Sequence, residues 1–178
     1  DGAATTRTCK HEKFTGVDGT PAVDNQLYRV LGCSMGHRGA GHSGFITNYL
    51  NERMREGMVT YVIEVTGIKD PRNSDDVKVG VYLGLDPLKQ DAAGGVQADT
   101  TIRISADPRW HNIVRGRIKD GVLTTDAFDV NLPSDPLWIP GFAFKQAHLK
   151  LELQPDGRAK GILAAYHDWF PIYWGLAK

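Results

Sequence analysis

The sequence has no surplus of either charge and no long apolar run. Its 178 residues include 21 Lys and Arg against 21 Asp and Glu, so its formal net charge is zero. Proteins that bind nucleic acid or an anionic membrane surface rely on a basic surplus, which this chain lacks. No apolar run reaches the roughly 18 residues that a membrane-spanning helix requires. We therefore expect no nucleic-acid partner and no membrane span.

Cysteine is scarce, and both of its positions lie near the N-terminus. Cys9 and Cys33 are the only cysteines, and a disulfide between them would tie the polar N-terminal segment to the first ordered element. Closing a loop of about 25 residues in this way stabilises a folded chain by roughly 3–4 kcal/mol. Two free buried thiols are the alternative interpretation. A disulfide indicates an oxidising compartment, so we expect a secreted, periplasmic or cell-surface protein.

The first residues also favour export. The chain has no initiator Met and opens with a stretch of small and polar residues, 1–6. Such a start is typical of a mature N-terminus left after removal of a signal peptide, although a trimmed chain would look the same.

Motifs of several enzyme classes are missing. The sequence holds no P-loop, no G-x-G-x-x-G and no C-x-x-C-H, and residues 41–44 are one residue short of the G-x-S-x-G nucleophile elbow. His37 and His42 lie five residues apart, and a zinc site would need His11 or His111 as a third ligand. Exposed loop histidines are therefore the better interpretation.

Glycine and proline are plentiful, with 20 and nine residues, which favours turns over long helices. Two short helices are nevertheless predicted. The first covers residues 25–31 with Asp24 as its N-cap, and the second begins after Ser43 and ends at Gly57. The Gly-rich residues 34–44 between them are predicted as loop.

From residue 58 onward, apolar and polar residues alternate, which is typical of strands with one face on a core. Six or seven strands are predicted, within residues 58–66, 77–85, 101–105, 113–118, 122–131, 144–153 and 159–166. The pattern of the sixth slips near Gln146. Short connections, including a hairpin signal at residues 119–121, favour antiparallel pairing.

These elements predict a mainly β fold in a single domain of residues 1–178. The expected architecture is an antiparallel β-sandwich or a jelly-roll-like fold, with one or two short N-terminal helices. The chain divides into an N-terminal arm with helices (1–57), a β-sheet core (58–166) and an aromatic tail (167–178).

Two acidic loops carry the densest set of oxygen ligands. Calcium needs six to eight oxygen ligands, more than either loop offers alone, so a site would form only where the fold joins them. The predicted ligands of this structural calcium ion are Asp18, Asp24, Asn25, Asp70, Asn73 and Asp75. In the alternative interpretation Asp24 only caps a helix and the second loop only builds a turn.

Aromatic residues gather at the C-terminus, where five of the nine residues 166–174 are aromatic against 9% in the whole chain. Ordering a terminus costs backbone entropy, so a terminus this apolar should be buried against its own sheet, another chain or further sequence. We expect it to contact another polypeptide or a second copy of the chain, and core closure is the alternative. The predicted partner or ligand surface comprises Trp110, Trp138, Trp169, Phe170, Tyr173 and Trp174.

The loop sequences DGTPAVDNQ (residues 18–26) and DPRNSDD (70–76) resemble those of secreted bacterial β-rich proteins to which we attach no activity. The resemblance covers most of the chain. It implies secretion and a β-rich fold, and it implies that the two acidic loops are more than accidental turns.

The leading hypothesis is an exported, non-catalytic binding or accessory subunit with calcium as a structural ion. One alternative is a carbohydrate-binding, lectin-like module that uses its tryptophans to stack on a glycan. A second alternative is a hydrolase with acid–base groups such as His167 and Asp168, since two titratable side chains are adjacent there.

Overall fold

The computed structural model describes residues 15–17, 19–21, 25–38, 44–134 and 141–176. Three helices come first in the chain, α1 (Gln26–Leu31), α2 (Met35–Arg38) and α3 (Phe45–Arg55). The strands are β1 (Thr60–Thr66), β2 (Ser74–Gly84), β3 (His111–Lys119), β4 (Val122–Thr125), β5 (Phe128–Pro133), β6 (Gly141–Leu153) and β7 (Ala159–Tyr166). A 3-10 turn, η2 (Pro108–Trp110), precedes β3, and helix α4 (Trp169–Leu176) follows β7.

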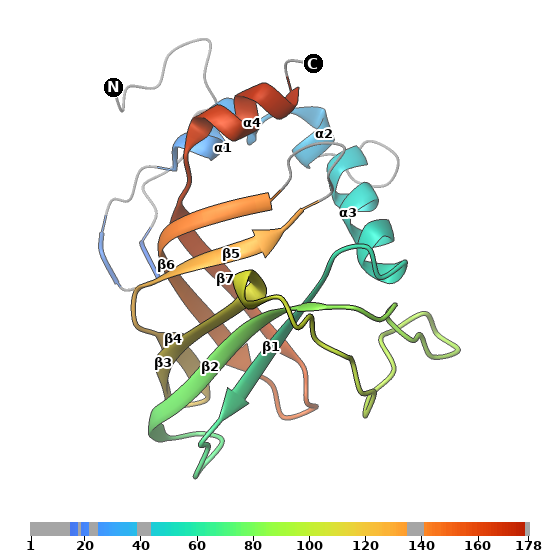
Figure 1. Ribbon diagram of the computed structural model, residues 1–178. Helices are drawn as coiled ribbons and strands as arrows, with labels where there is room; N and C mark the ends of the chain where they lie inside the picture. Colours follow the sequence, from blue (N-terminus) through green and yellow to red (C-terminus); the bar gives the residue numbers. More distant parts are fainter. Residues whose placement is uncertain (1–14, 18, 22–24, 39–43, 135–140, 177–178) are drawn as a thin grey trace.

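The strands form one antiparallel sheet of seven strands, in the order β1-β2-β3-β4-β6-β5, with β7 paired to β6. The prediction of a mainly β, antiparallel fold with short N-terminal helices is confirmed. A sandwich or jelly roll is not confirmed, because the described strands belong to a single sheet that curves on itself. In Figure 1 helices α1, α2 and α4 lie together at one end of this sheet, and the β1–β2 connection lies at the other end.

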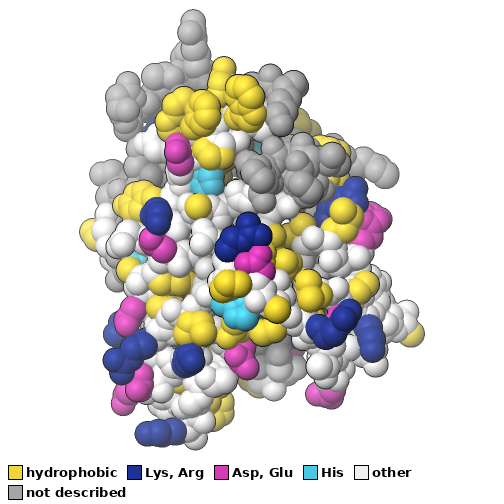
Figure 2. All heavy atoms as spheres, viewed as in Figure 1, with side chains coloured by type: hydrophobic (Ala, Val, Ile, Leu, Met, Phe, Trp, Pro, Cys, Tyr) yellow, Lys and Arg dark blue, Asp and Glu magenta, His cyan; other side chains and the backbone are white. Residues whose placement is uncertain are grey.

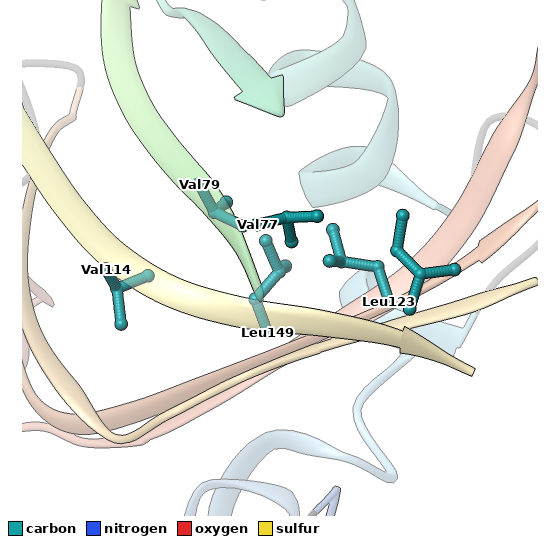
Figure 3. Close-up of a cluster of buried hydrophobic side chains, with 6 residues drawn as sticks. Val77, Val79, Val114, Leu123 and Leu149 are labelled. Atoms are coloured by element: carbon teal, nitrogen blue, oxygen red, sulfur yellow. The ribbon is translucent and has the colours of Figure 1, made fainter. Parts of the chain in front are cut away.

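Alternation along the strands places one face of the sheet on the core. In β3, Asn112, Val114, Gly116 and Ile118 are buried while the residues between them are exposed. The largest cluster of buried side chains comes from strands β2, β3, β4 and β6, and it comprises Val77, Val79, Val114, Ile118, Leu123 and Leu149. Figure 3 shows five of these side chains pointing toward one another. The cluster therefore packs side chains of β2 and β3 against those of β4 and β6.

A second core cluster shows how strongly the sheet curves. Val81 of β2 packs with Val130 and Leu132 of β5, although β5 lies four strands away in the pairing order. Buried Asn112 of β3 links the same strands: its Nδ2 donates to the main-chain oxygens of Val81 (3.0 Å) and Asn131 (2.9 Å), and its Oδ1 accepts the Asn131 N–H (2.8 Å). One amide side chain thus joins β2, β3 and β5.

Several predicted elements differ from the structure. Residues 101–105 form only an isolated bridge, between Ile104 and Gly84, instead of a strand. The predicted strand 122–131 is two strands, β4 and β5, separated by Asp126 and Ala127. The predicted loop 34–44 contains helix α2.

Both helices also begin one residue later than predicted. Asn25 is the N-cap of α1, with its Oδ1 accepting the Tyr28 N–H at 2.9 Å, and Gly44 is the N-cap of α3, with no side-chain cap bond. Asp24 and Ser43, the predicted caps, lie outside the described residues.

Candidate functional site: an exposed aromatic helix

The aromatic tail forms a helix, α4, whose start is set by the residues before it. The Asp168 carboxylate accepts the N–H of Phe170 at 3.0 Å, which is the bond of a helix N-cap. Pro171 lies in the first turn, where its missing N–H has no intrahelical partner to lose and its fixed φ suits the helix. Local capping therefore offsets the weak helix propensity of the aromatic residues.

Four aromatic side chains cover one face of α4. Successive residues of a helix are 100° apart, so pairs four residues apart lie on the same face. The exposed fractions are 68% for Trp169, 52% for Phe170, 58% for Tyr173 and 59% for Trp174. We call these four side chains the aromatic face. In Figure 2 hydrophobic side chains gather at the end of the molecule that α4 occupies in Figure 1.

The rings of the aromatic face support one another. Ring centroids lie 5.7 Å apart for Trp169 and Phe170, 5.9 Å for Trp169 and Tyr173, and 6.3 Å for Phe170 and Trp174. Such edge-to-face and stacked contacts each contribute about 0.5–1.5 kcal/mol beyond burial. The contacts hold the exposed rings in one arrangement, which lowers the entropy lost when a partner binds.

His167, two residues before α4, packs on the sheet, and the side of α4 opposite the aromatic face is less exposed than that face. Pro171, Ile172 and Gly175 are half-buried. The His167 ring packs edge-on against Phe142 and Phe144, at centroid distances of 5.5 and 5.2 Å. Its Nδ1 donates to the main-chain oxygen of Asp168. The junction between β7 and α4 is therefore fixed to strand β6.

These contacts also bear on an acid–base role for His167 and Asp168. The Asp168 carboxylate caps α4, and the His167 ring is packed on two phenylalanine rings. The His167 ring hydrogen-bonds to the main-chain oxygen of Asp168 and not to its carboxylate. Both side chains thus have a structural explanation that does not need catalysis.

The two other tryptophans of the predicted surface lie elsewhere or outside the described part. Trp110 is half-buried in η2, with the Arg109 guanidinium 5.4 Å from its ring centroid. A Cβ at Gly141 would lie 3.6 Å from its Cη2. Trp138 lies outside the described residues. Among the described tryptophans, only Trp169 and Trp174 belong to the aromatic face.

The residues predicted to bind calcium are not brought together in the described part of the chain. Asn25 caps α1, at the opposite end of the molecule from the β1–β2 connection that carries Asp70 and Asn73, and Asp75 lies at the start of β2. Asp70 Oδ1 accepts the Arg72 N–H (2.8 Å), and Asn73 Oδ1 accepts the Asp120 N–H (3.2 Å). The other two predicted ligands, Asp18 and Asp24, lie outside the described residues.

Calcium binding stays a prediction, which a chelator tests. Within the described ranges no group of three or more His, Cys, Asp and Glu side chains is placed to hold a metal ion. If calcium joins the two acidic loops, chelation should lower the melting temperature through loss of ligand stabilisation, and Asp75→Ala should remove this sensitivity. A melting curve that the chelator leaves unchanged would assign the acidic residues of the loop to turn formation alone.

The predicted disulfide lies partly outside the described residues. Cys33 is not a free thiol, and Cys9, the only other cysteine of the sequence, is not described. Pairing of Cys9 with Cys33 therefore stays a prediction, and so does the oxidising compartment inferred from it.

A polar cluster on the outer face of the sheet was not predicted. The Tyr82 hydroxyl donates to Glu64 Oε2 (3.2 Å), and the His111 ring lies edge-on to the Tyr82 ring at 5.4 Å. Burial, followed by the Glu64 carboxylate, raises the pKa of Tyr82. His111 Nε2 is bonded to the Ser105 carbonyl, which only accepts, so Nε2 carries the proton. The registers of β1 with β2 and of β2 with β3 create the cluster, and no local motif signals it.

Two hollows on the sheet surface are weaker candidates for a binding site than the aromatic face. One, of about 510 Å³, is lined by Lys78, Ile113 and Arg115, and Arg115 is already paired with Asp76 at 3.0 Å. The other, of about 250 Å³, is lined by Arg117, Asp126 and His148 among others. Both are open, and their charged side chains are exposed or half-buried. The aromatic face of α4 therefore remains the best candidate for a functional site.

The described part of the molecule is thus a curved antiparallel sheet with an exposed aromatic helix at one end. No protein-family model matches the sequence, and no curated protein or solved structure matches it either. None of the described helices is long and apolar enough to cross a membrane.

Proposed function

We propose that the protein is an exported, non-catalytic binding subunit whose helix α4 docks on another polypeptide. The observation that carries this proposal is the aromatic face, four large apolar side chains that are more than half exposed at the end of the sheet. Trp and Tyr dominate the energetically important positions of protein interfaces. Export stays part of the proposal and rests on the predicted disulfide between Cys9 and Cys33.

The size of the aromatic face fits the centre of an interface. Large aromatic side chains bury about 150–250 Å² each, so four of them that are slightly more than half exposed offer roughly 300–600 Å². A standard interface buries about 800 Å² on each partner. The aromatic face would therefore supply the central anchor, while neighbouring residues supply the rim.

A glycan is the alternative ligand, because sugars also stack on aromatic rings. Three observations support a polypeptide instead. The rings lie against one another and share one convex helix face, Trp110 is partly covered by Arg109, and the two hollows are lined by other residues. Sugar sites are usually concave, as small-molecule sites are in general.

The test compares the double variant Trp169→Ser/Trp174→Ser with the native chain in a pull-down from cells that make the protein. A partner retained by the native chain should bind the variant at least about 30-fold more weakly, since loss of one hot-spot side chain costs about 2 kcal/mol or more. Ile113→Ser is the matched control, because Ile113 is 49% exposed on strand β3. This control should retain the partner.

Folding and alternative ligands are checked with the same variants. All replaced side chains are exposed, so the melting temperatures should change little. Native chain and double variant are also applied to neutral phospholipid vesicles and to a glycan array. The proposal would be contradicted if the native chain bound the vesicles or a glycan, the double variant did not, and the pull-down retained no polypeptide.

A further inference from the structure

Strand β7 is exposed along its whole length. Among the described strands it pairs with β6 only. All eight of its residues are exposed, even Leu163, which lies opposite the buried Leu149 of β6. Lys160 is its only charged residue, and it contains no Pro. Long apolar edges of this kind are sites where a further strand adds to a sheet.

The register shows which main-chain groups point away from β6. The Gln154 N–H donates to the Arg158 carbonyl (2.8 Å) at the turn before β7, and hydrogen-bonded and non-hydrogen-bonded pairs alternate along an antiparallel ladder. Counting along the β6–β7 register, even-numbered residues of β7 bond to β6. The N–H and C=O groups at the outer edge belong to Ala159, Gly161, Leu163 and Ala165.

We propose that β7 pairs antiparallel with β7 of a second copy of this chain, about a twofold axis at Ile162. This proposal goes beyond the docking role of α4 and does not use the aromatic face. In this register Ala159 lies opposite Ala165 of the second copy, and Gly161 opposite Leu163. All four outward-facing residues then find hydrogen-bonded partners, and the two sheets become continuous.

The side chains of β7 suit pairing with themselves. Lys160 lies opposite Ala164 of the second copy, so the two like charges are kept apart. Leu163 lies opposite Gly161, where a Cβ would come within 2.7 Å of Leu151 Cδ2, so a large side chain faces the residue that has none. Ile162, which is 57% exposed, meets its own copy at the axis. An isologous contact of this kind closes as a dimer.

The mass in solution tests the proposal. The full chain of 19.6 kDa should sediment with twice that mass over a concentration series. Ile162→Lys places two ammonium groups against each other at the axis and should give the monomer mass. Ile113→Lys, on β3 away from the edge, should leave the dimer intact. A monomeric native chain, or a dimer that survives Ile162→Lys, would overturn the proposal.

A cysteine cross-link tests the register. Residue 162 and its copy form a non-hydrogen-bonded pair, with Cα atoms about 4.5 Å apart, which is within the range of a disulfide. Ile162→Cys should therefore cross-link the dimer under mild oxidation. Ala164→Cys, which lies opposite Lys160 of the second copy, should not cross-link. Equal cross-linking of both variants, or of neither, would overturn this register.

The two proposals are separable in the same measurements. Trp169→Ser/Trp174→Ser should lose the partner of α4 and still sediment as a dimer. Ile162→Lys should sediment as a monomer and still bind the partner of α4. A double variant of α4 that sediments as a monomer would assign the dimer contact to α4 and overturn the role of β7.

Discussion

Replacing Asn112 with alanine is expected to lower the free energy of unfolding by about 3 kcal/mol or more. The side chain is buried, and the change removes its hydrogen bonds to the Val81 carbonyl and to the N–H and C=O of Asn131. A buried polar group left without a partner costs about 1–3 kcal/mol. The effect is measured by urea unfolding of the native chain and the variant.

The neighbouring residue provides a control. Ile113→Ala changes the same strand on its exposed face and should alter the stability by less than about 1 kcal/mol. If Asn112→Ala lowered the free energy of unfolding as little as Ile113→Ala, the amide would not join β5 to β2 and β3 as described. A fall in the denaturant m-value alone would instead indicate a change in the unfolded state.

Raising the pH from about 9 to about 12 is expected to destabilise the protein by about 2–3 kcal/mol through Tyr61. Burial raises the pKa of Tyr61 from 10.0 to about 12, and its hydroxyl donates to the Pro133 carbonyl at 2.7 Å. Between these two pKa values the unfolded chain loses the phenolic proton while the folded chain keeps it. Stability therefore falls with rising pH, by up to about 1.4 kcal/mol for each unit.

The variant Tyr61→Phe separates this effect from general alkaline unfolding. It should lose about 1 kcal/mol at neutral pH, because the Pro133 carbonyl loses its donor. Above pH 10 its stability should fall less steeply than that of the native chain. Tyr82 contributes in the same direction, since its pKa is also raised. Parallel pH profiles of the two proteins would contradict the role given to Tyr61.

Strand alternation made most of the sheet predictable. The slip expected near Gln146 is confirmed, since Gln146 has a φ of 51° and the β6–β7 register shifts between Lys145 and His148. Asp129 holds this bulge, with its carboxylate accepting the Gln146 N–H and binding Lys145, and these bonds lower the pKa of Asp129. The sequence alone predicted this bulge because the bulge interrupts a regular alternation of apolar and polar residues.

Contacts between distant residues explain what the sequence did not predict. The predicted strand began after Asn112, whose burial depends on partners in β2 and β5, far from it in the sequence. Helix α4 depends on the cap at Asp168 and on packing of Pro171 and Ile172, since its aromatic residues favour helices weakly. The distance between Asn25 and the second acidic loop is likewise a property of the whole fold.

Strand β6 joins most of the molecule, and this affects how the chain can fold during synthesis. Residues 150–152 pair with β4, residues 141–147 with β5, and residues 145–153 with β7. Until β6 leaves the ribosome, β4 and β5 have no partner along the edge that β6 later occupies, and Leu123 lacks its neighbour Leu149. A growing chain that ends before residue 141 exposes apolar surface of this kind, which is a target for chaperones and for aggregation. The sheet thus cannot be completed until residues 141–153 have been made.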